Sequence, residues 1–408
     1  MDLDIRAIRT DEVDRYLHEV ETPFSYVPTE EDVRRERLTL EPERALAAFD
    51  GDDIVGSAAA YSLDLTIPGG VVPMAGVTLV GVRPTHRRRG ILTELMRRQL
   101  LDLRDRGDLL AGLWASEGSI YQRFGYGLAT LHSRFTIDRG RTAFARDLPQ
   151  DPGALRMVSR QQALPAMQAV YERARPEVPG MLSRPGPWWE SLYADPESHR
   201  DGAGPLFFVL HETAGSPDGY VAYRAKPGWV DGSPYGEAMI HELMAIQPAT
   251  HAALWRFVFG IDLVKAVSAW RRPADEPLLY MLAEPRRLRL ELHDALWLRL
   301  VDVPAALAAR AYGIDGSVVV RVRDDFCPWN DGVLEVGGGP GGGRARPAPG
   351  ADPDLYVEAA DLAAVYLGGT SFDRLVRAGR VTATGEDALQ RADAMFATVR
   401  APWCPHLF

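Results

Sequence analysis

The chain has 408 residues, a hydrophobic fraction of 46%, a charged fraction of 25% and a formal net charge of −10. Its length predicts two or three domains, each with a sizeable core. The acidic balance weighs against general binding to nucleic acid or anionic membranes and favours a cationic substrate. The two cysteines, Cys327 and Cys404, are too few for a disulfide framework or a zinc cluster, so we expect a reducing cytoplasm and no metal.

The N-terminal part of the chain predicts a mixed α/β unit over residues 1–150. Residues 1–16 are charged throughout and have no apolar core, so no signal peptide is expected. The chain has no apolar run long enough to span a bilayer, so no membrane span is expected. Apolar spacing and turn residues define the elements. We expect, in order, a helix at 11–20, strands at 44–49, 54–67 and 74–82, a helix from Gly90 to Gly107, a strand at 109–116 and a short helix at 117–124.

Two further units follow a polar, proline-containing stretch from Asp147 to Pro152, which predicts a domain boundary. Residues 151–288 repeat the α/β mixture, and residues 289–408 form a third unit that opens with a strand and then a helix starting near Pro304. The glycine-rich run 337–343 predicts a flexible loop, because no strand-to-helix context makes it a phosphate cradle.

One internal repeat links the first two units. LVGVRPTHRRRG, which ends at Gly90, superposes on LMAIQPATHAAL, which ends at Leu254. The second copy keeps the strand, turn and helix pattern but has Ala253 where the first has Arg89. This pattern predicts a duplicated domain that has lost an anion site.

The arginine turn, residues Arg87 to Gly90, lies between a predicted strand and a predicted helix. Free N–H groups and the macrodipole make a helix entrance favourable for anions, and a glycine lets a ligand approach the backbone. Arginines add charge-assisted hydrogen bonds. The turn therefore predicts a pyrophosphate site; the alternative is a solvated basic helix start that pairs with Glu94 or Asp102.

The strand, the RRRGIL turn and the following helix resemble the GNAT acetyltransferases, whose signature is Q/R-x-x-G-x-G/A; Leu92 stands where the second small residue is usual. Over the whole chain, PTHRRRG, ASEGSIYQRFGYG, YERARPEVPGMLSRPGPWW, LWLRLVDVPAALAARAY, YLGG and an aromatic last residue resemble the Eis family of actinobacterial N-acetyltransferases.

The resemblance implies an α/β (α+β) protein with two GNAT-like domains in tandem and a sterol-carrier-like C-terminal domain. Residues 1–150 would hold acetyl-CoA, residues 151–288 would lack a cofactor site, and residues 289–408 would supply the C-terminal carboxylate. Members of the family form homohexamers and transfer acetyl from acetyl-CoA to amines, in some cases aminoglycosides.

The resemblance also implies roles for individual residues. Cofactor contacts would come from Val80, Gly81 and Val82 on the strand, from Arg88, Arg89, Gly90, Ile91, Leu92 and Thr93 at the phosphates, and from Ser116 and Glu117 on the far side. The acceptor pocket would be lined by Phe24, Tyr26, Leu63 and Trp114. Tyr26 and Leu407 stand where acidic residues are expected, which lowers the negative charge available to a polycationic aminoglycoside.

Amine acetylation needs a base for the ammonium and an acid for the leaving thiolate. Tyr121 and Tyr126 are both candidate acids, and the resemblance assigns this role to Tyr121. It assigns the base to the terminal carboxylate, here that of Phe408. From the residues themselves, His406 and Glu117 are rival bases, since an α-carboxylate has an ordinary pKa of about 3.5.

Two other functions are alternatives to an acetyltransferase that acts on a small-molecule amine or an exposed lysine. A lipid-binding protein would act through the third unit and would need an apolar tunnel within residues 289–408. A nucleic-acid binder would use Arg87 to Arg89 with Arg97 and Arg98, but the acidic balance and the lack of nearby stacking aromatics weigh against it.

Overall fold

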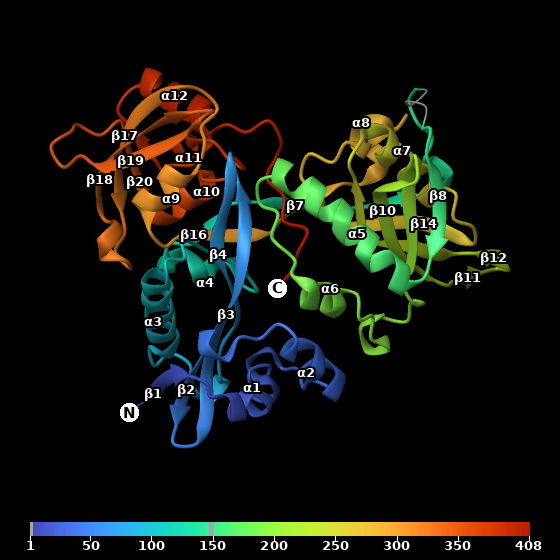
Figure 1. Ribbon diagram of the computed structural model, residues 1–408, viewed down its shortest axis with the longest axis horizontal. Helices are drawn as coiled ribbons and strands as arrows, with labels where there is room; N and C mark the ends of the chain where they lie inside the picture. The colour runs from blue at the N-terminus through green and yellow to red at the C-terminus, as the bar shows by residue number, and fades with distance from the viewer. Residues whose placement is uncertain (1–2, 147–150) are drawn as a thin grey trace.

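The computed structural model describes residues 3–146 and 151–408, and it consists of three lobes (Figure 1). The N-terminal lobe is drawn in blue to teal, the second in green to yellow and the C-terminal lobe in orange to red. The chain end lies near the centre of the molecule, close to the first and second lobes. Residues 147–150, part of the expected boundary stretch, lie outside the described residues.

The first lobe is a seven-stranded sheet in the order β1-β2-β3-β4-β5-β16-β6. Its strands are β1 (Asp4–Ala7), β2 (Ala45–Asp50), β3 (Asp53–Ile67), β4 (Gly70–Val82), β5 (Leu110–Trp114), β16 (Leu296–Leu300) and β6 (Gly127–Leu128). Its helices are α1 (Val13–Glu19), α2 (Glu30–Arg37), α3 (Ile91–Arg106) and α4 (Gly118–Tyr121). Helix α3 begins after Gly90 and buries an apolar face that includes Leu95 and Leu100 against this sheet.

The second lobe is another seven-stranded sheet, in the order β15-β7-β14-β13-β10-β9-β8. Its strands are β15 (Glu291–Asp294), β7 (Leu131–Asp138), β14 (Val264–Pro273), β13 (Gly236–Ala245), β10 (Ser216–Lys226), β9 (Phe207–Thr213) and β8 (Ala154–Val158), with a small hairpin of β11 (Trp229–Val230) and β12 (Ser233–Pro234). Its helices are α5 (Arg160–Ala174), α6 (Gly186–Leu192), α7 (Pro248–Phe259) and α8 (Leu278–Met281).

The first two lobes exchange strands across the expected domain limits. Strand β7 precedes residue 150 yet pairs with β14 in the second sheet, whereas β16 follows residue 288 yet pairs with β5 and β6 in the first. Hydrophobic patterning predicted the strand that opens the third unit but none at β7, and it carries no information about which sheet a buried strand joins. The limits at 150 and 288 stay predictions.

The third lobe combines a five-stranded sheet, in the order β19-β18-β17-β20-β21, with four helices. The elements are β17 (Gly316–Arg323), β18 (Gly332–Gly339), β19 (Gly342–Pro347), β20 (Leu355–Glu358), β21 (Thr382–Ala383), α9 (Val303–Ala309), α10 (Ala359–Val365), α11 (Phe372–Arg377) and α12 (Glu386–Phe396).

The flexible loop expected at 337–343 is wrong, because β18 and β19 pair there as a hairpin, with Gly338 opposite Gly343. A Cβ at Gly343 would lie 2.4 Å from the Arg310 carbonyl oxygen, so the glycine permits the hairpin to approach the end of α9. Composition therefore suggested a loop where close packing requires glycine.

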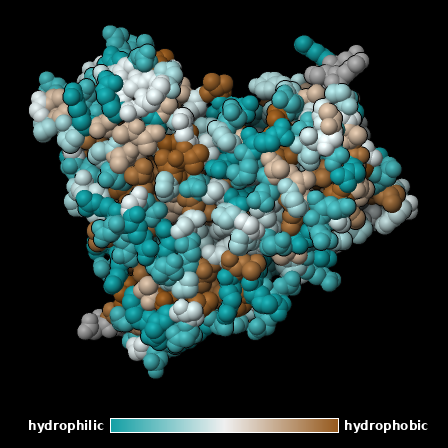
Figure 2. All heavy atoms as spheres, viewed as in Figure 1, coloured by the Kyte–Doolittle hydropathy of each residue, from teal (hydrophilic) through white to brown (hydrophobic). Residues whose placement is uncertain are grey.

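The surface in Figure 2 is mainly hydrophilic, with hydrophobic side chains in scattered patches on the face shown. Within residues 3–146 and 151–408, no helix has the length and apolar character needed to cross a membrane.

Candidate active site

The site begins where β4 and β5 separate. The two strands pair in parallel from Met74 to Gly76, opposite Leu110 to Gly112, and the pairing stops there although β4 runs on to Val82. One extra residue in β4, with Leu79 at φ +52°, shifts its register against β3. Such a bulge bends a strand and is frequent beside active sites. The β4 edge beyond Gly76 therefore offers backbone polar groups to a ligand in the opening.

The arginine turn lies at the end of this strand. After the short 3₁₀ helix η4 (Pro84–His86), Arg88 has a left-handed φ of +63° and Gly90, the N-cap of α3, has φ +83°. No side chain caps this helix, so its first-turn N–H groups are available. Left-handed residues at a helix entrance gather backbone N–H groups into an anion-binding concavity.

The three arginines of the turn differ in their surroundings. Arg87 donates to the carbonyl oxygens of Val82 and Pro23, at 3.3 and 3.2 Å, and so holds the turn against the N-terminal segment. Arg88 and Arg89 are exposed. Glu94, a possible partner in the solvated-helix alternative, accepts from Arg97 at 2.9 Å instead.

A first cavity of about 590 Å³ opens between the turn, β4 and α4. Every predicted cofactor residue except Arg89 lines it, namely Val80, Gly81, Val82, Arg88, Gly90, Ile91, Leu92, Thr93, Ser116 and Glu117. Sequence reasoning missed Pro23, His86, Ile120 and Arg123, which line it as well. Arg123 stands two residues after Tyr121 in the same helical segment, and its charge was a usable signal.

A second cavity of about 220 Å³ adjoins the first, and Phe24, Val80, Ser116 and Tyr121 line both. Phe408, the last residue of the chain, and Trp114 belong to this second cavity. The proposed acid and the terminal residue therefore reach one space, next to the cavity that contains the arginine turn.

The two candidate tyrosines occupy different environments. Tyr121 is 5% exposed and lines both cavities, and burial, with a further contribution from the charge of Glu117, raises its pKa to about 12. Tyr126 is fully buried, lines neither cavity, and its hydroxyl has no hydrogen-bond partner among the described residues. Its ring centre lies 6.0 Å from that of Tyr121. The geometry therefore distinguishes Tyr121 from Tyr126, which the sequence motif alone offered as equal candidates for the acid.

The C-terminal segment enters the opening between β4 and β5. The Trp403 backbone N–H donates to the Pro179 carbonyl oxygen at 2.8 Å, and the Trp114 indole N–H donates to the His406 carbonyl oxygen at 2.8 Å. The Phe408 ring packs on Gly76, where a Cβ would lie 3.2 Å from it. The chain end is thus fixed by contacts on both sides of the site.

The two rival bases do not line the cavity that Phe408 lines. His406 is fully buried beside the Trp188 ring and lines neither cavity, and burial together with nearby Arg184 and Arg271 holds its pKa well below the ordinary value. Glu117 is exposed and lines the first cavity.

The four predicted acceptor residues are not all brought together. Phe24 and Trp114 line the second cavity, whereas Leu63 is buried and packs beside Phe408 at Gly76. Tyr26 is exposed, lines neither cavity, and donates its hydroxyl to Asp32 at 2.6 Å.

Sequence reasoning missed an acidic residue in the second cavity. Glu21 lines it, and burial, followed by the negative charges of Glu36 and Asp32, raises the pKa of the Glu21 carboxyl. Nothing in its sequence neighbourhood singled it out.

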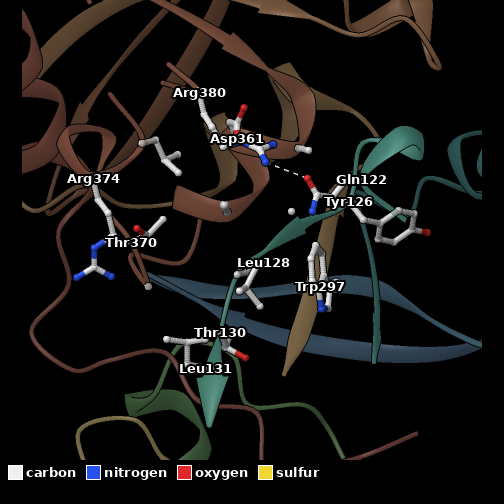
Figure 3. Close-up of a pocket in the computed structure, with 16 residues that line it drawn as sticks. Gln122, Tyr126, Leu128, Thr130, Leu131, Trp297, Asp361, Thr370, Arg374 and Arg380 are labelled. Carbon is white, nitrogen blue, oxygen red and sulfur yellow. Dashed lines mark hydrogen bonds and ion pairs between the residues drawn. The ribbon is translucent and has the colours of Figure 1, made fainter. Parts of the chain in front are cut away.

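A third cavity, of about 300 Å³, lies at the junction of β6 and the C-terminal lobe (Figure 3). Arg380 of that lobe donates to Gln122 at 2.9 Å across it. Apolar side chains fill the interior of the lobe itself, among them the fully buried Val320, Leu362 and Tyr366. The apolar tunnel that the lipid-binding alternative requires stays a prediction.

The second copy of the turn has different geometry. Helix α7 begins at Pro248, directly after Gln247, and carries the buried Ala252 and Ala253 in its first two turns. The arginines and the N-cap glycine of the first copy have no counterpart there. Among residues 3–146 and 151–408, no group of three or more His, Cys, Asp or Glu side chains is placed to hold a metal ion.

A sheet whose strands part beside a glycine-started helix, with a turn of left-handed residues between them, is the arrangement expected of the GNAT class of acetyltransferases. Models of the GNAT acetyltransferase domain match residues 4–129 and 180–300, and a sterol carrier protein domain model matches residues 303–405. These matches confirm the predicted fold class and imply acetyl-CoA as cosubstrate.

Whole-chain relatives make the assignment more specific. The chain is 43% identical to an uncharacterized N-acetyltransferase of Streptomyces avermitilis over the full length of both chains. It is 37% identical to the N-acetyltransferase Eis of Mycobacterium tuberculosis, over 86% of this chain and 85% of that one. The crystal structure of Eis1 from Mycobacterium abscessus superposes with a TM-score of 0.85 at 36% identity, covering both chains completely. The chain belongs to the Eis-like N-acetyltransferases, and it is an acetyltransferase.

Proposed function

We propose that this acetyltransferase moves the acetyl group of acetyl-CoA to the amine of a small cationic molecule, with Tyr121 as general acid and the Phe408 carboxylate as general base. One observation supports this most strongly: Tyr121 and Phe408 line the same cavity, which adjoins the cavity of the arginine turn.

The phosphates of the cosubstrate would lie on the first-turn N–H groups of α3 and on Arg88. The first cavity, of about 590 Å³, is within the range of small-molecule sites. The unpaired β4 edge from Val80 to Val82 would bind the amide-containing arm, which directs the thioester to the second cavity. Arg123 and His86, at the wall of the first cavity, would add positive charge and donors.

The reaction needs three proton movements. The acceptor ammonium loses one proton, its nitrogen lone pair forms a bond to the acetyl carbon, the bond from that carbon to sulfur breaks, and the nitrogen loses a second proton as the amide forms. The Phe408 carboxylate takes the first proton directly or through a water, the Tyr121 hydroxyl gives a proton to the leaving sulfur, and the second nitrogen proton restores that hydroxyl directly or through water. A Tyr121 pKa of about 12 keeps this hydroxyl protonated at neutral pH.

The acceptor is proposed to be a cation because the second cavity contains Glu21 and ends at a carboxylate, while aromatic Phe24 and Trp114 form its walls. A protonated amine is attracted both by carboxylates and by aromatic faces. An aminoglycoside, a polyamine and an exposed lysine all satisfy this chemistry. The homohexamer implied by the resemblance and the cytoplasmic location expected from the cysteine count stay predictions.

The proposal is tested by measuring release of free CoA thiol from acetyl-CoA with a panel of aminoglycosides, polyamines and lysine peptides. We expect acceptors with two or more positive charges to give the highest kcat/KM, and Glu21→Gln to lower kcat/KM for these more than for a monoamine. Equal turnover of neutral and cationic amines, unaffected by Glu21→Gln, would contradict the proposed acceptor class.

A further inference from the structure

A fourth, very small cavity lies beneath the C-terminal segment, within the second lobe. It is lined by Arg184, Leu192, Tyr193, His241, Glu242, Arg271 and Pro405. None of these residues lines the two cavities of the candidate active site. Most come from the second lobe, and Pro405 lies three residues before the end of the chain.

The carboxylate in this cluster is already neutralised. Arg184 donates to both oxygens of Glu242, at 3.0 and 2.9 Å, and Tyr193 donates its hydroxyl to the same group. Although burial acts to raise the pKa of Glu242, Arg184 lowers it to about 2, so the carboxylate is charged at neutral pH. One cation and one anion therefore form a closed pair.

Arg271, the second arginine at this cavity, takes no part in that ion pair. Its guanidinium makes no hydrogen bond or ion pair with any described residue, and its central carbon lies 4.9 Å from the centre of the Trp270 ring. Its Nε is buried, as is the Nε of Arg184, and neither has an acceptor. Buried donors of this kind are nearly always satisfied in folded proteins, because an unmet one is costly.

The neighbouring histidines do not supply the missing negative charge. Burial and the charge of Arg271 lower the pKa of His241 to about 3, so this ring is neutral. His406, on the C-terminal segment, is buried and neutral as well. The described residues of the cluster therefore include one more cation than anion, and the Nε of each arginine is buried without an acceptor.

We propose that this cavity binds a small inorganic anion, of the size and charge of chloride, between Arg271 and Arg184. The anion would accept from the two free Nε–H groups and balance the charge. The cavity volume of about 10 Å³ excludes a phosphate or a carboxylate ligand.

The anion would also strengthen the hold on the C-terminal segment. Pro405 forms one wall of the cavity, and the Arg271 carbonyl oxygen accepts from the Trp403 indole N–H at 2.8 Å. The two next residues lead to Phe408, so the ion would stabilise the placement of the chain end. This consequence for activity rests on the proposed function; binding of the ion does not.

The probe for the site is bromide. Crystals of the full chain grown in sodium bromide should show an anomalous peak between Arg271 and Arg184. In solution, chloride that replaces gluconate at constant ionic strength should raise the melting midpoint. At a concentration of one hundred times Kd, the folded-to-unfolded ratio should rise about 100-fold.

Two variants serve as test and control. Arg271→Met removes the uncompensated charge, so its melting midpoint should no longer respond to chloride. Arg156→Met breaks an exposed pair with Glu212 in the same lobe and should leave the chloride response unchanged. If Arg271→Met does not fold, the bromide peak in the unaltered protein decides the matter.

An ordered water without an anomalous peak, or a chloride response that persists in Arg271→Met, would overturn the proposal. Activity is read separately as kcat in chloride and in gluconate, and a lower kcat in gluconate is expected. A bromide peak with kcat independent of chloride leaves the site in place and refutes its link to the chain end. A bromide peak in a protein without acetyl transfer refutes the proposed function and not the anion site.

Discussion

Tyr121→Phe keeps the ring of the proposed acid and removes its proton. General acid catalysis contributes roughly 10²–10⁴-fold to rate, so kcat should fall by that factor, which equals about 2.7–5.4 kcal/mol in the barrier. The Tyr121 hydroxyl has no hydrogen-bond partner among the described residues, so the free energy of unfolding should change by less than about 1 kcal/mol. The Kd for acetyl-CoA should be unchanged.

Tyr126→Phe is the matched control, since it removes a hydroxyl from the neighbouring ring. This hydroxyl is buried and unsatisfied within the described residues, so its loss should raise the free energy of unfolding, by up to about 3 kcal/mol, and should leave kcat nearly unchanged. Stopped-flow single-turnover rates and urea unfolding of both variants give the comparison. Equal losses of kcat in the two variants, or a larger loss in Tyr126→Phe, would refute the assignment of the acid.

Three other outcomes are expected. Arg88→Ala should weaken acetyl-CoA binding roughly 10- to 150-fold by calorimetry, because one charge-assisted bond of about 1.5–3 kcal/mol is lost; unchanged affinity would remove Arg88 from the phosphate site. Gly76→Ala should lower kcat and spare acetyl-CoA affinity, because its Cβ would crowd the terminal ring, whereas Gly70→Ala on the same strand meets no atom within 4 Å and should be silent. As the pH drops below about 6.5, the free energy of unfolding should decrease by up to about 1.4 kcal/mol per pH unit for each of His241 and His406. The reason is that the folded state keeps both rings neutral, whereas the unfolded state binds a proton at each. His406→Phe should reduce this slope by up to about 1.4 kcal/mol per pH unit in urea titrations, and an unaltered slope would contradict the burial argument.

Local order in the first lobe was largely predictable from the sequence. Turn residues and apolar spacing placed β3, β4, α3 and β5 within a few residues, because these signals act over short distances. Gly90 was identified as the start of α3 for the same reason, since few other residues take its left-handed conformation at low cost.

What sequence reasoning missed depends on contacts between distant parts of the chain. Which sheet β16 joins is set by its pairing with β5, more than 180 residues earlier in the chain. Glu21 reaches the second cavity through the path of the N-terminal segment, and Arg271 is unusual because its buried Nε has no acceptor. Helix α7 buries Ala252 and Ala253, which the repeat could not reveal.

The central claim is that the carboxylate at the end of the chain is the base. Two glycines added after Phe408 keep every side chain and convert that carboxylate into a neutral amide. The measurement is kcat at saturating acetyl-CoA for this extended chain, with acetyl-CoA affinity and melting midpoint recorded beside it. The account predicts that kcat collapses by about 10²-fold or more while affinity and melting midpoint persist. A fully active extended chain would contradict it and leave Glu117 as the base to test.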